Sequence, residues 1–168
     1  MRSRKIKKIS VIIPVYQNNK SINGLFRELG KLEKKLKEHK ASLEIVCVDD
    51  GSTDGSYKKL LKIKKTKNNL KIIKFSKNYG ASTALIYGMK VIKGDAVTFL
   101  AADLQDDPLI INTMVKKWIQ GSKLVICERS SRSDPFLSKC FSKFYYFLVR
   151  KLIYKKFPRE GFDMFLLD

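Results

Sequence analysis

The chain has few of the residues that build disulfide frameworks, zinc sites or histidine-based catalytic centres. It contains three cysteines and one histidine among 168 residues. The cysteines are far apart, odd in number and form no CxxC pair, so we interpret them as reduced thiols rather than as a disulfide framework or a metal site. Zinc-finger spacing, an RRM signature and a helix-turn-helix pattern are also absent, and we therefore expect no nucleic-acid partner.

Long apolar runs are missing as well. No stretch approaches the roughly 18 apolar residues that a membrane-spanning helix needs, so the sequence predicts no such helix. The basic start leads into a short apolar run, residues 9–15, which is followed by polar residues without a small-residue cleavage site. A secretory signal is therefore not expected, and the reduced cysteines favour a cytoplasmic location.

Acidic residues are scarce relative to basic ones. The sequence has 16 Asp and Glu against 35 Lys and Arg, which gives a formal net charge of +19. Lysines crowd three stretches, 31–40, 58–74 and 139–156. Such a surface attracts polyanions: nucleic acid, anionic lipid headgroups or nucleotide phosphates. The alternative is a solvated lysine-rich surface without such a partner, and composition alone leaves both open.

Apolar runs alternate with amphipathic stretches along the chain. The β-branched runs predict strands over residues 9–15, 43–48, 70–75, 96–102 and 123–127. The stretches between them predict helices over 21–39 with Ser21 as its cap, from Asp54 or Ser56 onward, over 80–92, and over 108–120. This alternation indicates an α/β fold with a mostly parallel sheet and helices on both faces.

The segment that ends the fourth predicted strand is the most informative. The apolar run stops abruptly at Asp103, Gln105, Asp106 and Asp107. Oxygen ligands then lie at the carboxyl edge of the sheet, where open α/β sheets bind ligands. Mg²⁺ and Mn²⁺ prefer such oxygens and usually arrive with a substrate phosphate, so we expect an enzyme that uses a phosphorylated donor. Alternatively, Asp106 and Asp107 cap the helix that starts at Pro108.

Three other strand ends carry polar motifs. The first strand leads into Pro14 and Tyr16, and the second ends in Asp49 and Asp50 before a glycine that permits a tight turn. The third leads into the segment 75–85, in which a lysine and a glycine precede a helix. Each motif has an ordinary structural alternative, namely a strand exit, a helix cap or a β-to-α turn.

Taken together and in order, these four segments resemble the family 2 glycosyltransferases with the GT-A fold. The resemblance is closest to the polyprenyl-phosphate branch, and it runs from about residue 8 to residue 168. It implies a Rossmann-like, mostly parallel sheet flanked by helices. We therefore expect residues 1–168 to form a single GT-A catalytic domain, truncated before a C-terminal membrane region.

The resemblance also implies roles for individual residues. Pro14 and Tyr16 would hold the nucleotide base, and Asp50 would accept a base N–H with Asp49 beside it. Lys77 and Gly80 would face the donor's phosphates.

The fourth segment corresponds to the family's metal-binding motif. Asp103 would bind the donor and, with Gln105, a Mg²⁺ or Mn²⁺ cofactor. Two departures stand out: Ala101 replaces the first aspartate of this motif, and Gln17-Asn18-Asn19 replaces the family's Asn-Glu-Glu.

On the acceptor side, the resemblance places basic residues against an acceptor phosphate. Arg129 is the first candidate, followed by Arg132, Lys139 and Lys143. The stretch 136–157 mixes aromatic and basic residues, which fits an interfacial helix on an anionic membrane; the alternative is a core helix with snorkelling lysines. We expect a protein that is peripheral to the inner face of the cell membrane. The sequence does not determine its oligomeric state.

The implied reaction is inverting sugar transfer from an NDP-sugar, with UDP-sugar as the expected donor, to a polyprenyl phosphate. A lipid phosphate is already ionised and needs no general base, whereas a sugar hydroxyl would need a carboxylate such as Asp106, Asp107 or Asp163. Two alternatives remain. One is a family 2 glycosyltransferase that acts on a saccharide hydroxyl in cell-surface polysaccharide synthesis. The other is a nucleotide- or polyanion-binding module without turnover.

Overall fold

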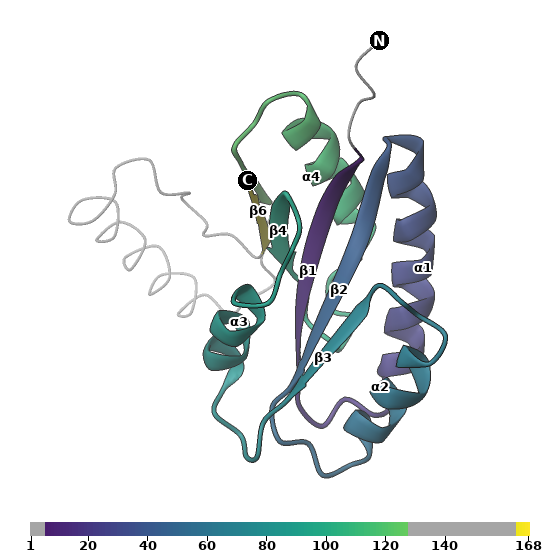
Figure 1. Cartoon of the computed structure of the whole chain (residues 1–168), viewed down its shortest axis with the longest axis vertical. Helices are drawn as coiled ribbons and strands as arrows, with labels where there is room; N and C mark the ends of the chain where they lie inside the picture. The colour runs from purple at the N-terminus through teal and green to yellow at the C-terminus, as the bar shows by residue number, and fades with distance from the viewer. Residues whose placement is uncertain (1–5, 128–163) are drawn as a thin grey trace, which may run out of the picture. The chain divides into compact units, whose positions relative to one another are not determined.

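The computed structural model describes residues 6–127 and 164–168 (Figure 1). The chain divides into two compact units, residues 1–125 with 166–168, and residues 126–165; almost all of the second lies outside the described residues. The strands are β1 (Lys7–Val15), β2 (Ala41–Asp49), β3 (Leu70–Lys74), β4 (Ala96–Phe99), β5 (Leu124–Cys127) and β6 (Met164–Leu167). They form one sheet in the order β3-β2-β1-β4-β6-β5.

The sheet is mostly parallel where its register is defined. β1 pairs in parallel with both β2 and β4, and β2 pairs in parallel with β3. Only a short antiparallel contact joins β4 to β6. The predicted α/β fold with a mostly parallel sheet is therefore confirmed.

Four helices are described: α1 (Ile22–Glu38), α2 (Ser56–Lys64), α3 (Ala81–Met89) and α4 (Ile110–Ile119). Figure 1 shows α1 and α2 on one side of the sheet and α3 on the other. Within the described parts of the chain, no helix is long and apolar enough to cross a membrane.

The long helix α1 packs through the stripe that the sequence predicts. Six apolar side chains at helical spacing are buried: Ile22, Leu25, Phe26, Leu29, Leu32 and Leu36. Each fully buried leucine contributes about 1.5–3 kcal/mol relative to an exposed one, so this stripe anchors α1 to the sheet. The opposite face carries lysines and glutamates that form exposed ion pairs of small energetic value.

Helix α3 packs against the other face of the sheet at very short range. A Cβ atom at Gly88 would lie 2.4 Å from Cγ2 of Ile12 in β1, so only glycine allows this approach. Ile12 belongs to a buried cluster that also contains Val46, Phe75 and Ala84.

A buried polar network ties three strands together within the sheet. The Ser10 hydroxyl donates to Oε2 of Glu44 over 2.5 Å, and the Lys71 ammonium lies 2.8 Å from Oε1. The Lys93 amide also donates to Oε2 over 2.7 Å. Burial acts to raise the pKa of Glu44, but the hydrogen bonds that it accepts outweigh burial and hold this pKa below its ordinary value.

Three local expectations were wrong, and one element was not predicted. β4 ends at Phe99 and α3 ends at Met89, each three residues before its predicted end, and β6 is the element that was not predicted. Ser21 stands at the N-cap position of α1, but its side chain makes no capping bond to the helix. Its hydroxyl is instead 2.7 Å from the Ala102 carbonyl oxygen, to which it donates.

Candidate functional site

The carboxylate that follows β2 holds the loop that follows β3. Oδ1 of Asp50 accepts a hydrogen bond from the Tyr79 amide over 2.7 Å, and Oδ2 accepts one from the Gly80 amide over 2.9 Å. The Asp50 side chain is buried, and its own amide donates to the Val15 carbonyl at the end of β1. One aspartate therefore connects the carboxyl ends of β1 and β2 with the β3–α3 loop.

Gly51 makes this arrangement sterically feasible. Its φ of +73° lies in the left-handed region, and a Cβ there would come within 2.5 Å of the Lys77 carbonyl carbon. Because the opposing atoms are backbone, no rotamer change would relieve the contact. The β2–α2 turn and the β3–α3 loop therefore touch backbone to backbone.

The exit of β1 is tied to the same turn. Gln17 has a φ of 56°, its amide donates to the Ser52 hydroxyl over 3.1 Å, and its side-chain amide donates to the Thr53 hydroxyl over 2.9 Å. Oδ1 of Asn18 accepts from the Tyr16 amide over 2.8 Å. Gln17 and Asn18 thus shape the loop that leaves β1 by hydrogen bonding.

Asp54 serves the start of α2. Its Oδ1 accepts from the Ser56 amide over 2.9 Å and from the Ser56 hydroxyl over 2.6 Å, while Oδ2 accepts from the Asn19 amide over 2.9 Å. Burial acts to raise the pKa of Asp54, but these bonds outweigh it and keep the pKa below its ordinary value. Asp54 therefore satisfies the first amide of α2, two residues into the turn, and holds the Asn19 amide of the loop that leaves β1.

The pKa of Asp49 is shifted in the opposite direction from that of Asp54. Its side chain is fully buried at the end of β2, and neither carboxylate oxygen makes a hydrogen bond of ordinary geometry to a described residue. Burial raises the pKa of Asp49, and the nearby Ser52 hydroxyl and amide oppose this shift without cancelling it. An unpaired buried carboxylate costs folding energy, so Asp49 is a candidate for a role in binding.

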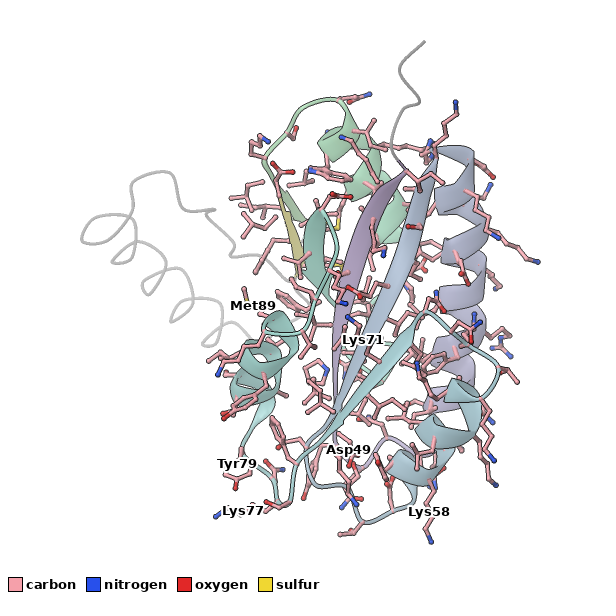
Figure 2. All side chains as sticks on the ribbon, viewed as in Figure 1. Asp49, Lys58, Lys71, Lys77, Tyr79 and Met89 are labelled. Atoms are coloured by element: carbon pink, nitrogen blue, oxygen red, sulfur yellow. The ribbon has the colours of Figure 1, made fainter. Side chains whose placement is uncertain are left out.

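Two tyrosines remain accessible at this edge of the sheet. Tyr16 is 47% exposed and Tyr79 is 50% exposed, although the Tyr79 ring packs edge-on against Phe75. The Lys77 ammonium lies 5.3 Å from the centre of the Tyr79 ring. Figure 2 shows Asp49, Lys77 and Tyr79 toward the same end of the sheet. Aromatic faces beside a cation suit a ligand that combines a flat ring with anionic groups.

The acidic segment after β4 is anchored to the start of α1. The Ser21 hydroxyl bonds the carbonyl oxygens of both Asn18 and Ala102, which links the β1 exit to the segment. Leu104, with a φ of 65°, packs so closely that a Cβ at Gly24 would lie 2.9 Å from its Cδ1. These contacts place the acidic segment next to the loop that leaves β1.

Within this segment the carboxylates divide their roles. Oδ1 of Asp107 accepts from the Leu109 amide over 2.9 Å, so it caps the turn into α4. Asp103 is exposed, with Oδ1 accepting from the Gln105 amide over 3.2 Å, and Asp106 is half-buried. No three described His, Cys, Asp or Glu side chains converge as a metal-binding group. Asp103 and Gln105 alone therefore supply two oxygen ligands, and a divalent ion there would need ligands from a bound molecule.

Most of the predicted site residues meet at one edge. Pro14, Tyr16, Asp49, Asp50, Lys77 and Gly80 all lie at the carboxyl ends of the neighbouring strands β1, β2 and β3. The expected phosphate role of the Gly80 amide conflicts with its contacts, because this amide already donates to Asp50 and to Oδ1 of Asn78. The Ala81 and Ser82 amides precede the first intrahelical bond of α3, from Ala84 to Gly80, and are better placed for that role.

Some expectations concern the other part of the chain. Arg129, Arg132, Lys139, Lys143, Asp163 and the stretch 136–157 lie outside the described residues. Sequence reasoning also missed Ser52, whose hydroxyl accepts the Gln17 amide. Its position directly after an Asp-Gly turn was the available signal.

Comparison with known families shows to which family the chain belongs. Residues 10–167 match the family model described as glycosyl transferase family 2. The chain belongs to glycosyl transferase family 2. Relatives of the chain include an uncharacterized glycosyltransferase of Synechocystis sp., which is 34% identical over 95% of this chain and 50% of its own length. An undecaprenyl-phosphate 4-deoxy-4-formamido-L-arabinose transferase of Photorhabdus laumondii is 33% identical over 90% of this chain and 46% of its own.

Solved glycosyltransferase structures share the fold. TarS 1–349 of S. aureus superposes with a TM-score of 0.58 at 24% identity, covering 76% of this chain and 38% of that one. The mannosyltransferase PcManGT of Pyrobaculum calidifontis, solved with GDP-Man and Mn²⁺, gives a TM-score of 0.59 at 23% identity, covering 73% and 36%. The GT-A fold class expected from the four motifs is thereby confirmed. The chain spans about half the length of the curated relatives that it matches.

Proposed function

We propose that this family 2 domain binds an NDP-sugar, with UDP-sugar as the preferred donor, and transfers the sugar with inversion to a polyprenyl phosphate. The observation that carries the donor site is the double hydrogen bond from Tyr79 and Gly80 to Asp50. It joins three loops at the carboxyl edge of a parallel sheet, where such folds bind nucleotides. The acceptor class is supported by the relative from Photorhabdus laumondii, whose name states an undecaprenyl-phosphate substrate.

In the proposed donor complex, Tyr16 and Asp50 take the nucleotide base. Each oxygen of Asp50 accepts one backbone amide and keeps a second lone pair for a base N–H. The Lys77 charge and the first-turn amides of α3 face the diphosphate, which the positive end of the helix also favours. Lys77 acts as a point charge and not as a fork, so it tolerates small differences in phosphate position.

A divalent ion, Mg²⁺ or Mn²⁺, is held in this proposal by Asp103 and Gln105. The replacement of the first motif aspartate by Ala101 leaves one carboxylate fewer, so diphosphate oxygens supply further ligands. When bound, the ion stabilises the negative charge that develops on the leaving diphosphate. We expect metal affinity to be weak without nucleotide and stronger with it.

The proposed reaction is a single displacement at the anomeric carbon. An acceptor phosphate oxygen forms the new bond to this carbon, the bond to the donor diphosphate breaks, and its electron pair leaves with the nucleotide. The acceptor phosphate is already ionised, so no proton has to be removed. Arg129 and Arg132 are proposed to hold the acceptor phosphate.

A saccharide hydroxyl as acceptor would change one requirement. Its proton needs a base, and Asp106 is the candidate because it is half-buried next to the proposed metal ligands. Catalysis at a lipid acceptor also implies that the protein works at a membrane surface. The basic net charge of +19 favours an anionic one.

A transfer assay tests the proposal. The chain is incubated with Mn²⁺, undecaprenyl phosphate, saccharide acceptors and UDP- or GDP-sugars that carry a radiolabelled sugar, and label is then measured in the organic phase and on the saccharides. We expect label to enter the lipid fraction from one donor. Label on added saccharides alone would support the hydroxyl acceptor, whereas nucleotide binding without any sugar release would support a binding module without turnover.

A further inference from the structure

The segment from α2 to the end of α3 has an unusual charge distribution. Residues 55–94 contain eleven lysines and no aspartate or glutamate. They form α2, the edge strand β3 and α3, so the acid-free stretch makes up one whole edge of the sheet and the helices beside it. The excess therefore lies at the β3 edge of the sheet, on both of its faces.

Helix α3 adds an apolar face to this cationic edge. Ile86 is 56% exposed and Met89 is 52% exposed, and Tyr87 is nearly half exposed. The helix buries only a narrow strip at Ala84 and Gly88 against the sheet. The exposed face of α1, by comparison, carries lysines and glutamates, as is usual for a helix face in contact with water. The exposed apolar side chains of α3 therefore indicate a surface that another apolar phase covers.

Cations border this apolar face. Lys90 lies with its ammonium 4.4 Å from the Tyr87 ring, and Lys93 is exposed in the loop that follows α3. At the other end of the helix, Lys77 lies beside Tyr79. Figure 2 shows Tyr79 and Met89 on the same side of the molecule. We refer to Tyr79, Ile86, Tyr87, Met89, Lys90 and Lys93 as the α3 surface.

We propose that the α3 surface docks on an anionic lipid bilayer. Ile86 and Met89 enter the boundary between headgroups and acyl chains, the tyrosines lie at the headgroup level, and Lys90 and Lys93 reach the lipid phosphates. This inference is independent of the donor chemistry, because adsorption needs no nucleotide. It also gives a geometric consequence: Lys77 and Tyr79, at the edge of the proposed donor site, come next to the membrane.

A bilayer fits this surface better than a second copy of the chain. A two-fold symmetric dimer brings the same patch of both subunits together. Each α3 surface would then face a copy of itself, and residues 55–94 of neither copy offer a carboxylate to pair with Lys90 and Lys93; the next carboxylate in the sequence, Asp95, already accepts the Lys8 amide. Anionic lipid headgroups supply that charge, each nearby lysine strengthening adsorption about fivefold.

Vesicle flotation of the whole chain tests the inference. The protein is mixed with vesicles of phosphatidylcholine alone and with vesicles of phosphatidylcholine and phosphatidylglycerol, and the bound fraction is measured at low and high salt. The variant Ile86→Ser with Met89→Ser is compared with Ile110→Ser with Ile119→Ser, which removes two exposed apolar side chains from α4. We expect the first pair to lower partitioning into anionic vesicles by about tenfold and the second pair to leave it unchanged.

Substitution of lysines provides a second test that does not depend on apolar side chains. Lys90→Ser with Lys93→Ser should weaken binding by about 25-fold, about fivefold for each lysine, and Lys116→Ser with Lys117→Ser on α4 should weaken it far less. Melting temperatures show that each variant folds. Equal losses in the matched pairs would overturn the inference. So would a dimer, detected by sedimentation, that the α3 substitutions dissociate while vesicle binding persists.

Discussion

Asp50 accepts the amide hydrogens of both Tyr79 and Gly80, with one carboxylate oxygen for each amide. Two loops that are separated by a helix and a strand in the sequence are thereby joined by a single side chain. The bond geometry makes the loop between β3 and α3 part of the rigid sheet edge. Since Lys77 and the start of α3 belong to that loop, Asp50 positions the groups proposed to meet the donor's phosphates.

Asp50→Asn should loosen this loop. The amide side chain offers one acceptor oxygen, so one of the two backbone amides loses its bond to this side chain, at a cost of about 1–3 kcal/mol in the free energy of unfolding. Affinity for UDP, measured by titration calorimetry with Mn²⁺, should fall as well. Glu44→Gln is the matched control, because it destabilises a buried network without contacting any residue of the proposed site. Equal nucleotide affinity in both variants would contradict the role of Asp50.

Gly51→Ala should be among the most damaging substitutions in the β2–α2 turn. Its Cβ meets Lys77 backbone atoms in a left-handed conformation, and the two penalties together amount to about 3 kcal/mol or more. Gly121→Ala separates the terms, since Gly121 has a φ of +111° but no atom within 4 Å of its Cβ position. It should cost about 1–2 kcal/mol by urea denaturation. Similar losses in the two variants would mean that the loops do not touch in solution.

The Glu44 network predicts a specific pH dependence. Because the pKa of Glu44 is lower in the folded chain, its stabilisation is fully present above its unfolded pKa of about 4.3 and is lost as pH falls through the folded pKa. At neutral pH, Glu44→Gln should lower the free energy of unfolding by about 1–3 kcal/mol. The gap between wild type and variant should shrink in acid. Urea denaturation at a series of pH values measures this gap, and a constant gap would show that Glu44 is not ionised in the network.

Asp49 should show the opposite sign. Its pKa is raised in the folded chain, so the protonated side chain favours folding at low pH, and this contribution is lost as pH rises through the folded pKa. Asp49→Asn should therefore raise the melting temperature at neutral pH, and its advantage should disappear in acid. If Asp49 serves binding, the same variant should show a smaller thermal shift with UDP. Asp95→Asn, at an exposed carboxylate, should change neither property in this way.

Metal use can be separated from helix capping within the acidic segment. Asp103→Ala should remove the Mn²⁺-dependent part of the thermal stabilisation by UDP, because it removes the proposed carboxylate ligand. Asp107→Ala should lower the melting temperature, since the bond from the Leu109 amide that holds the turn into α4 is worth about 0.5–1.5 kcal/mol, but it should keep the Mn²⁺ effect. Retention of that effect in Asp103→Ala would contradict the proposed metal site.

The fold was largely predictable because its signals are local. The apolar stripe on α1 and the β-branched strands are recognisable from the spacing of apolar residues. Strands and helices also alternate along the chain, which predicts parallel pairing. The pairing of β4 with β6 joins Thr98 to Leu166, and no local pattern specifies a partner so far along the chain. The early end of β4 was also not predictable from local sequence, because the extent of this strand is set by its pairing with β1 and β6.

At the site, the motifs predicted which residues meet but not what they bond to. Asp49 and Asp50 are adjacent and chemically identical, yet Asp49 makes no hydrogen bond of ordinary geometry to a described residue and Asp50 accepts two amides. Only the tertiary course of the β3–α3 loop makes this distinction. Ser21 shows the same limit, because its hydroxyl bonds a carbonyl of the distant acidic segment in place of its own helix.

Hydrogen–deuterium exchange of the whole chain, with and without UDP and Mn²⁺, tests most directly whether the nucleotide binds at the carboxyl ends of β1, β2 and β3. Protection should appear in residues 14–20, 49–56 and 76–82, the three loops that Asp50 and its neighbours connect. Protection confined to the opposite end of the strands, around Lys8, Lys40 and Asn69, or no protection at any nucleotide concentration, would contradict the proposed donor site.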